Sequence, residues 1–185
     1  LMLKSRLCIA FFAFAVGCAP AQKPLTDYVN PMLGTATLWD SVDLGFKPTK
    51  RTWGAEVFPG SSLPNAMVQV SPVTKFHSGA GYQYEDSVIY GFTHTNKGHW
   101  NLCHIPLLPV TGTPTPGDYC SPFSHERESA APGYYQVFLD RYGVDAQLSS
   151  TLRCAFHKYT YPAGAAASLL ADLQRSNEHV RAWDC

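Results

Sequence analysis

The sequence predicts an all-β fold, an antiparallel β-sandwich. Three consecutive segments carry the strongest strand signal, residues 134–139, 144–152 and 154–161, with turn residues 140–143 after the first of them. Apolar and polar residues alternate along the second segment, which predicts one buried and one solvated face. No segment has the periodicity of a convincing α-helix, so we expect these strands to form an antiparallel meander.

Shorter strands are predicted before and after this meander. Residues 66–71 alternate with period two, and a glycine-rich break separates them from two short candidates, residues 82–84 and 88–90. Residues 168–172 form a last apolar strand. No amphipathic helix follows the glycines, so they are not a nucleotide-binding fingerprint.

The segment 105–111 is apolar but contains Pro106 and Pro109. Proline has no backbone N–H to donate to a neighbouring strand. We therefore expect a buried strand here only at the edge of a sheet or at an interrupted position.

Length and composition indicate one ordinary globular domain. The 185 residues are 45% hydrophobic and 15% charged, with a formal net charge of zero. Because Lys and Arg do not cluster beyond the N-terminus, nucleic acid and anionic membrane surfaces are not expected partners. The aromatic content of 13% fits a sugar-binding β protein, although a tyrosine-rich core is the commoner cause.

Residues 1–21 are expected to be a signal peptide. Lys4 and Arg6 precede an apolar stretch, residues 7–17, which is too short to span a bilayer. Residues 15–18 fit a bacterial lipobox ending at Cys18, which would be acylated. Ordinary cleavage after residues 19–21 is the alternative. The first reading predicts a periplasmic or outer-membrane-anchored lipoprotein of a Gram-negative bacterium, in contact with the membrane only through its lipid anchor.

Four cysteines remain beyond the signal: Cys103, Cys120, Cys154 and Cys185. An exported protein can form disulfides, and four cysteines allow three complete pairings that the sequence does not rank. Buried free thiols are the other possibility. No C-x-x-C pair is present, so a structural zinc site is not expected.

Residues 91–109 are the most distinctive stretch of the chain. Three histidines, two asparagines, a lysine and Trp100 lie within residues 94–104. Such a density of polar groups beside an aromatic ring is poor core material and suits a sugar, whose hydroxyls need partners and whose C–H face needs an apolar surface. The alternative is a surface loop whose histidines bond to backbone groups while Trp100 fills the edge of a core.

Four segments resemble, in the same order, the N-terminal domain of glycoside hydrolase family 92: residues 57–72, 91–109, 123–126 and 131–135. These enzymes are bacterial, exo-acting, calcium-dependent, inverting α-mannosidases. The likeness extends from about residue 28 to about residue 172. It implies a galactose-mutarotase-like supersandwich over residues 25–173, incomplete here, followed by a truncated or aberrant tail, residues 174–185.

The resemblance also implies a division of chemistry between domains. The two carboxylates of inverting hydrolysis, and most of the calcium site, belong to an (α/α)6 domain that follows the sandwich in the family. We therefore assign no catalytic residue, metal ligand or cofactor to this chain and expect calcium only in the full-length enzyme. Six acidic residues form no marked acid/base pair and are expected to be mostly solvated: Glu56, Glu85, Asp86, Asp118, Glu126 and Glu128.

The resemblance implies that this domain completes a pocket for a mannose-containing glycan. The residues expected to line the pocket are His94, His99, Trp100, Asn101, Trp53 and Phe58. Trp100 would stack on a pyranose ring, whereas Tyr119 is expected to be an exposed aromatic outside the site. Residues 98–104 depart from the Gly-rich turn and acidic residues of many members, which leaves the linkage specificity open.

Two functional hypotheses follow. The first is the N-terminal domain of an exported α-mannosidase, inactive without its helical catalytic domain. The second is a self-standing carbohydrate-binding surface lipoprotein. A hydrolase of another kind is disfavoured because no Gly-x-Ser-x-Gly elbow is present. The spacing of His94, His99 and His104 does not converge on a metal.

Overall fold

The structure is a computed structural model that describes residues 22–37, 56–96, 102–115 and 117–177. These parts contain short strands and two single-turn 3₁₀ helices, η1 (Leu25–Tyr28) and η2 (His125–Arg127). The strands are β1 (Ser61–Ser62), β2 (Gln69–Val73), β3 (Val88–Ile89), β4 (Gly91–Thr93), β5 (Leu107–Thr111), β6 (Ser121–Pro122), β7 (Glu128–Ala131), β8 (Tyr134–Leu139), β9 (Val144–Ser150), β10 (Ala155–Thr160) and β11 (Ala167–Ala171).

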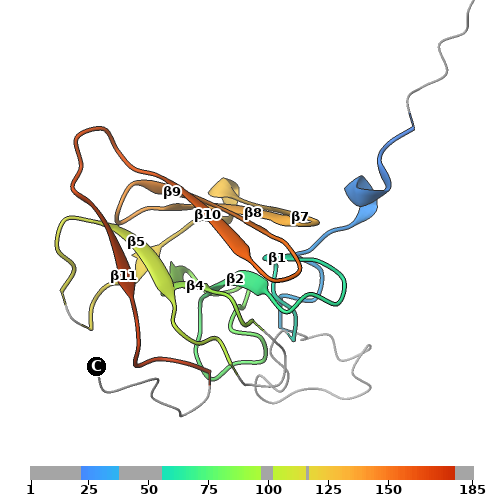
Figure 1. Cartoon of the computed structure of the whole chain (residues 1–185), viewed down its shortest axis with the longest axis horizontal. Coiled ribbons are helices and arrows are strands. Elements are labelled where there is room, and N and C mark those ends of the chain that lie inside the picture. Colours follow the sequence, from blue (N-terminus) through green and yellow to red (C-terminus); the bar gives the residue numbers. More distant parts are fainter. Residues whose placement is uncertain (1–21, 38–55, 97–101, 116, 178–185) are drawn as a thin grey trace, which may run out of the picture.

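Two antiparallel sheets face each other. One has the strand order β1-β2-β4-β5-β11, and the other is the meander β10-β9-β8-β7. Figure 1 shows the meander lying over β2, β4, β5 and β11. The remaining strands, β3 and β6, form a separate two-stranded sheet. The all-β antiparallel sandwich expected from the sequence is confirmed.

One hydrophobic cluster fills the space between the sheets. Its members from the first sheet include Val70, Phe92 and Leu108, and those from the meander include Tyr135 and Leu148. All five side chains are almost completely buried. Burial of this apolar surface from both sheets is the main source of stability of the sandwich.

The meander agrees closely with the prediction. β8 has the predicted bounds, and buried residues alternate with half-buried ones along most of β9. The connecting turn ends at Gly143, whose φ of +65° lies in the left-handed region that favours glycine. Its amide donates to the Leu139 carbonyl at 2.9 Å, which closes the turn and sets the register of Leu139 opposite Val144.

β7 extends the meander by one strand that the sequence did not predict. Its residues, Glu-Ser-Ala-Ala, have low β propensity and no apolar alternation. Pairing with β8 over four residue pairs supplies the stability that its composition lacks.

β5 shows how a sheet accommodates proline inside a strand. Pro109 lies opposite Leu169 of β11. The Asp172 amide donates to the Pro106 carbonyl and the Gly112 amide donates to the Ala166 carbonyl. Since hydrogen-bonded pairs alternate along an antiparallel ladder, Pro109 falls at a position where β11 requires no N–H. On the other side β4 pairs with β5 only at Leu107, which is the interruption that the sequence predicted.

Two predictions upstream of the meander are wrong in detail. Residues 82–84 form no strand, and the backbone there bonds to side chains and turns instead. The strand predicted at residues 66–71 is displaced to β2, where four consecutive residues, Val70 to Val73, are buried. Because neighbouring strands and loops cover both faces of β2, burial there does not alternate.

Candidate functional site

The distinctive stretch, residues 91–109, is described on both sides of residues 97–101. Of the six predicted pocket residues, the structure describes His94 and Phe58. His99, Trp100, Asn101 and Trp53 lie outside the described residues, as do Cys18 and Cys185. The geometry of the site is therefore that of its two flanks and of the elements that hold them.

The two flanks are residues 91–96 (the first flank) and 102–109 (the second flank). Hydrogen bonds join them to each other and to β2. The Gln69 amide donates to the His94 carbonyl at 3.0 Å, and the Asn96 amide donates to the Gln69 carbonyl at 3.1 Å. The Thr95 carbonyl accepts from the Cys103 amide at 3.3 Å. Residues 97–101 thus connect two ends that are each anchored by backbone hydrogen bonds.

The side chain of a buried asparagine, Asn96, holds the first flank in place. Asn96 is fully buried, accepts from the Thr93 hydroxyl at 2.5 Å and donates to the Ala80 carbonyl at 3.3 Å. The thiol of Cys103, on the second flank, points at the same carbonyl at 3.9 Å. Both flanks therefore meet the segment around Ala80.

Asn177 fixes the second flank. Its amide donates to the Leu102 carbonyl at 2.8 Å. Its side chain accepts from the Ser78 amide at 3.3 Å and donates to the Ser78 carbonyl at 2.7 Å, while its own carbonyl accepts from the His77 ring at 3.0 Å. Three segments that are distant in sequence meet here.

Backbone strain is concentrated around this junction. Five described non-glycine residues have a positive φ, and four of them are His77, Leu102, Cys103 and Ile105, with φ between 52° and 61°. Left-handed backbone is costly for side-chain-bearing residues, and most of all for β-branched Ile105. Such strain persists where the surroundings enforce it, and it clusters at binding and active sites.

His94 is held by two residues of β10. Its Nε2 lies 2.8 Å from Nε2 of His157, and Nδ1 of His157 lies 2.6 Å from the Tyr159 hydroxyl. Phe92 packs edge-on against His157 and stacks on Tyr159. Burial lowers the pKa of His94, and burial followed by the His94 charge lowers the pKa of His157 to about 4.

Phe58 is half-buried and packs against the hydrophobic cluster between the sheets. Phe58 lies in the segment 57–72, three residues before β1 begins. Its proposed contact with a sugar stays a prediction, as do those of the other five pocket residues.

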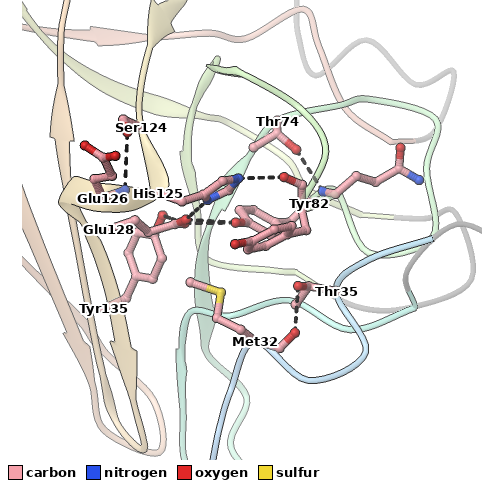
Figure 2. Close-up of polar contacts among 11 residues, drawn as sticks. Met32, Thr35, Thr74, Tyr82, Ser124, His125, Glu126, Glu128 and Tyr135 are labelled. Carbon is pink, nitrogen blue, oxygen red and sulfur yellow. Dashed lines mark hydrogen bonds and ion pairs between the residues drawn. The ribbon is translucent and has the colours of Figure 1, made fainter. Parts of the chain in front are cut away.

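A second polar cluster surrounds Glu128, whose side chain is 1% exposed. Figure 2 shows Tyr82, His125 and Tyr135 converging on its carboxylate. The Tyr82 hydroxyl donates at 3.0 Å, the Tyr135 hydroxyl at 2.5 Å and the His125 Nδ1 at 2.5 Å. His125 also donates through Nε2 to the Tyr84 carbonyl at 2.7 Å, a pattern that an imidazolium with two N–H groups satisfies.

Glu128 is an exception to the expectation that most of the acidic residues are solvated. Its three donors compensate for the loss of water, as a buried charge requires. Burial, and then the Glu128 charge, raises the pKa of both Tyr82 and Tyr135, so these phenols remain protonated donors. The cluster ties β7 and β8 to the segment around Tyr82 and leaves the carboxylate no access to a substrate.

Tyr119 is also buried, at 6% exposure, and not exposed as expected. Its hydroxyl donates to Asp172, whose other oxygen accepts from the amides of Gln174 and Arg175. Burial, followed by this hydrogen bond, raises the pKa of Tyr119. Asp172 therefore shapes the turn that carries the chain from β11 to Asn177.

The described cysteines differ in environment. Cys103 is buried, whereas Cys120 is half-buried and Cys154 is exposed. Cys120 and Cys154 are free thiols.

The described residues hold no cluster of carboxylate, imidazole or thiol groups that could ligate a metal ion. Calcium takes six to eight oxygen ligands, and no group of three His, Cys, Asp or Glu side chains in the described ranges could hold a metal ion. No helix among these residues has the length and apolar character needed to cross a membrane.

Comparison with known proteins identifies the family. The description "Glycosyl hydrolase family 92 N-terminal domain" matches residues 28–184. The chain belongs to glycosyl hydrolase family 92. The resemblance seen in the sequence is thereby confirmed, and this family-92 domain gives no match among curated protein sequences.

Solved family-92 structures share the fold. The α-mannosidase BT3965 from Bacteroides thetaiotaomicron, solved in complex with mannoimidazole, is 31% identical, with a TM-score of 0.70 over 83% of this chain and 20% of its own. The inverting mannosidase BT2199 from the same bacterium is 26% identical, with a TM-score of 0.63 over 82% and 20%. The chain spans about one fifth of the length of these enzymes.

Four residues that hold the site were not predicted: His157, Tyr159, Asn177 and Ser78. The alternation within residues 154–161 places His157 and Tyr159 on the inward face of β10, and this was the available signal. Nothing in the sequence pairs Asn177 with Ser78, because the two are 99 residues apart.

Proposed function

We propose that this chain is the N-terminal domain of an exported α-mannosidase and completes its pocket for a mannose-containing glycan. The family match over residues 28–184 carries the proposal, supported by the 31% identity to an α-mannosidase of which this chain covers 20%. The pocket contribution comes from His94 and residues 99–101, whose flanks Asn96 and Asn177 anchor, together with Trp53 and Phe58. Trp100 stacks on the sugar, and His94, His99 and Asn101 bond to its hydroxyls.

The cleavage machinery belongs to the (α/α)6 domain. Among the described residues the acidic side chains of Glu128 and Asp172 are 1% and 8% exposed, and both are saturated by internal donors. Neither could act as a general acid or base on a substrate without breaking those bonds. The calcium of the full-length enzyme, like the catalytic carboxylates, is therefore proposed to be held outside this domain.

The experiment is a domain exchange. Residues 25–177 of this chain replace the corresponding residues of BT3965, and mannose release from an α-linked mannobiose is measured. We expect turnover from the chimera and none from the isolated chain. Trp100→Ala in the chimera should weaken substrate binding by about 1–3 kcal/mol, the range for a well-packed aromatic contact.

Tyr28→Ala is the matched control, because Tyr28 is 70% exposed on η1, and it should leave binding unchanged. Turnover by the isolated chain would refute the division of labour between the domains. A chimera that is folded, binds calcium and yet shows no turnover would refute pocket completion. Loss of stability without loss of affinity in Trp100→Ala would place Trp100 in the core and not in the pocket.

The proposal that the protein is exported rests on the signal peptide predicted at residues 1–21, with Cys18 as the acylated residue. Cys18→Ala should move the protein from the membrane fraction to the soluble periplasmic fraction, because one lipid anchor is then lost. Immunoblotting of the two fractions measures the change. An unchanged membrane fraction would contradict lipidation at Cys18.

A further inference from the structure

The hydrogen bonds around His94 determine which of its nitrogens carries a proton. His94 Nε2 faces Nε2 of His157 at 2.8 Å, so one of these two nitrogens must donate and the other accept. Within the described ranges His94 Nδ1 makes no hydrogen bond. The side chain is half-buried, and Nδ1 is the ring nitrogen that these hydrogen bonds leave for a ligand.

The Tyr159 hydroxyl determines which partner donates in the two hydrogen bonds of His157. Among the described residues, the Tyr159 hydroxyl has one hydrogen-bond partner, Nδ1 of His157 at 2.6 Å. Burial, and then the nearby Tyr161, raises the pKa of Tyr159, so the phenol keeps its proton. A protonated phenol with a single acceptor donates to it.

The remaining protons follow by elimination. If Nδ1 of His157 accepts, a neutral His157 carries its proton on Nε2 and donates it to Nε2 of His94. A neutral His94 must then carry its own proton on Nδ1. Both rings stay neutral near pH 7, since burial lowers both pKa values and no carboxylate among the described residues opposes that effect.

We propose that Tyr159 and His157 are positioning residues that fix His94 as the Nδ1–H tautomer, so that it offers one uncharged donor to a neutral sugar hydroxyl. The identity of the ligand rests on the proposed function. The tautomer itself rests only on the two hydrogen bonds and on the packing of Phe92 against both β10 side chains.

An uncharged donor affects specificity. A hydrogen bond from a cation to an anion is about twice as strong as a neutral one, so a protonated histidine would favour phosphorylated or acidic sugars. The neutral Nδ1–H has no such preference, and it offers no acceptor at that nitrogen. The site is therefore suited to unsubstituted mannosides, whose hydroxyl oxygens accept.

The first test is a measurement of tautomers. Long-range ¹H–¹⁵N correlation NMR of the full chain with ¹⁵N-labelled histidine should show His94 protonated on Nδ1 and His157 protonated on Nε2 at pH 7. His94 protonated on Nε2, or a charged His94, would overturn the proposal. This readout needs no variant and no ligand.

The second test removes the hydroxyl that sets the direction. Tyr159→Phe keeps the ring that stacks on Phe92, and it should convert both histidines to tautomer mixtures. The hydrogen bonds from Tyr159 to His157 and from His157 to His94 form a relay. Tyr161→Phe is the matched control, because the Tyr161 hydroxyl bonds to the Ser168 carbonyl at 2.8 Å and lies outside this relay. Unchanged tautomers in a folded Tyr159→Phe variant would also overturn the proposal.

The third test connects the relay to the ligand. In the BT3965 chimera, Tyr159→Phe should raise the dissociation constant for methyl α-mannoside by about two- to tenfold, the range for one neutral hydrogen bond. Tyr161→Phe should leave the constant unchanged. Expected tautomers without mannoside binding would refute the proposed function and leave the relay intact, whereas binding with other tautomers would refute the relay alone.

Discussion

Replacing Glu128 by Ala should lower the free energy of unfolding by about 3–5 kcal/mol, the range for removing one partner of a buried charged network. The variant leaves the Tyr82 and Tyr135 hydroxyls without their acceptor inside the protein. It also leaves His125 with an N–H group that faced the carboxylate. Urea unfolding followed by intrinsic fluorescence measures the change.

Two further variants separate charge from packing. Glu128→Gln keeps the volume but puts an NH₂ group where a donor already points, so it should recover only part of the loss. Glu126→Ala, on an exposed neighbour, should change stability by less than about 0.5 kcal/mol. Equal effects of the changes at residues 126 and 128 would show that the Glu128 network contributes nothing specific.

Gly60→Ala is expected to cost about 3 kcal/mol, at the upper end for overpacking. A Cβ at Gly60 would lie 2.5 Å from the Ser71 Cα and closer still to the Val70 carbonyl oxygen, so the backbone of β2 would have to move. That movement breaks the pairing of Ser61 with Val70 and the bond between the Ser61 and Ser150 hydroxyls, which joins the two sheets.

Gly112→Ala is the control for Gly60→Ala. Gly112 has a φ of +73° but open space where a Cβ would lie, so only the conformational cost of about 1–2 kcal/mol applies. Thermal and urea unfolding of the two variants should rank Gly60→Ala as the more damaging. The reverse order would mean that β1 moves away from β2 at little cost.

The meander could be predicted from the sequence because its signal is local. β8 and β9 bury alternate side chains against one core, and Gly143 marks the turn between them. β7 could not be predicted, since its stability comes from pairing with β8 and not from its own residues. Pairing and burial of that kind depend on the tertiary structure.

The sequence singles out the stretch that holds the candidate site, which stays a prediction, but not the geometry around it. The polar density around Trp100 and the family motifs indicated residues 91–109. The groups that hold this stretch, Ser78, His157 and Asn177, come from other parts of the chain. Glu128 and Tyr119 gave no sequence signal of burial either, because their burial depends on donors and acceptors brought together by folding.

The anchoring of the second flank by Asn177 also sets an order of events during synthesis. The bonds from Asn177 to His77 and Ser78 span 100 and 99 residues. At about 5–20 residues per second, a ribosome needs about 5–20 s to extend the chain from His77 to Asn177. Once Leu102 and Cys103 have been made, their strained backbone lacks the Asn177 contact for the rest of that interval. The nascent chain must therefore reach the final arrangement of this flank late, after the strands of the meander have already been made.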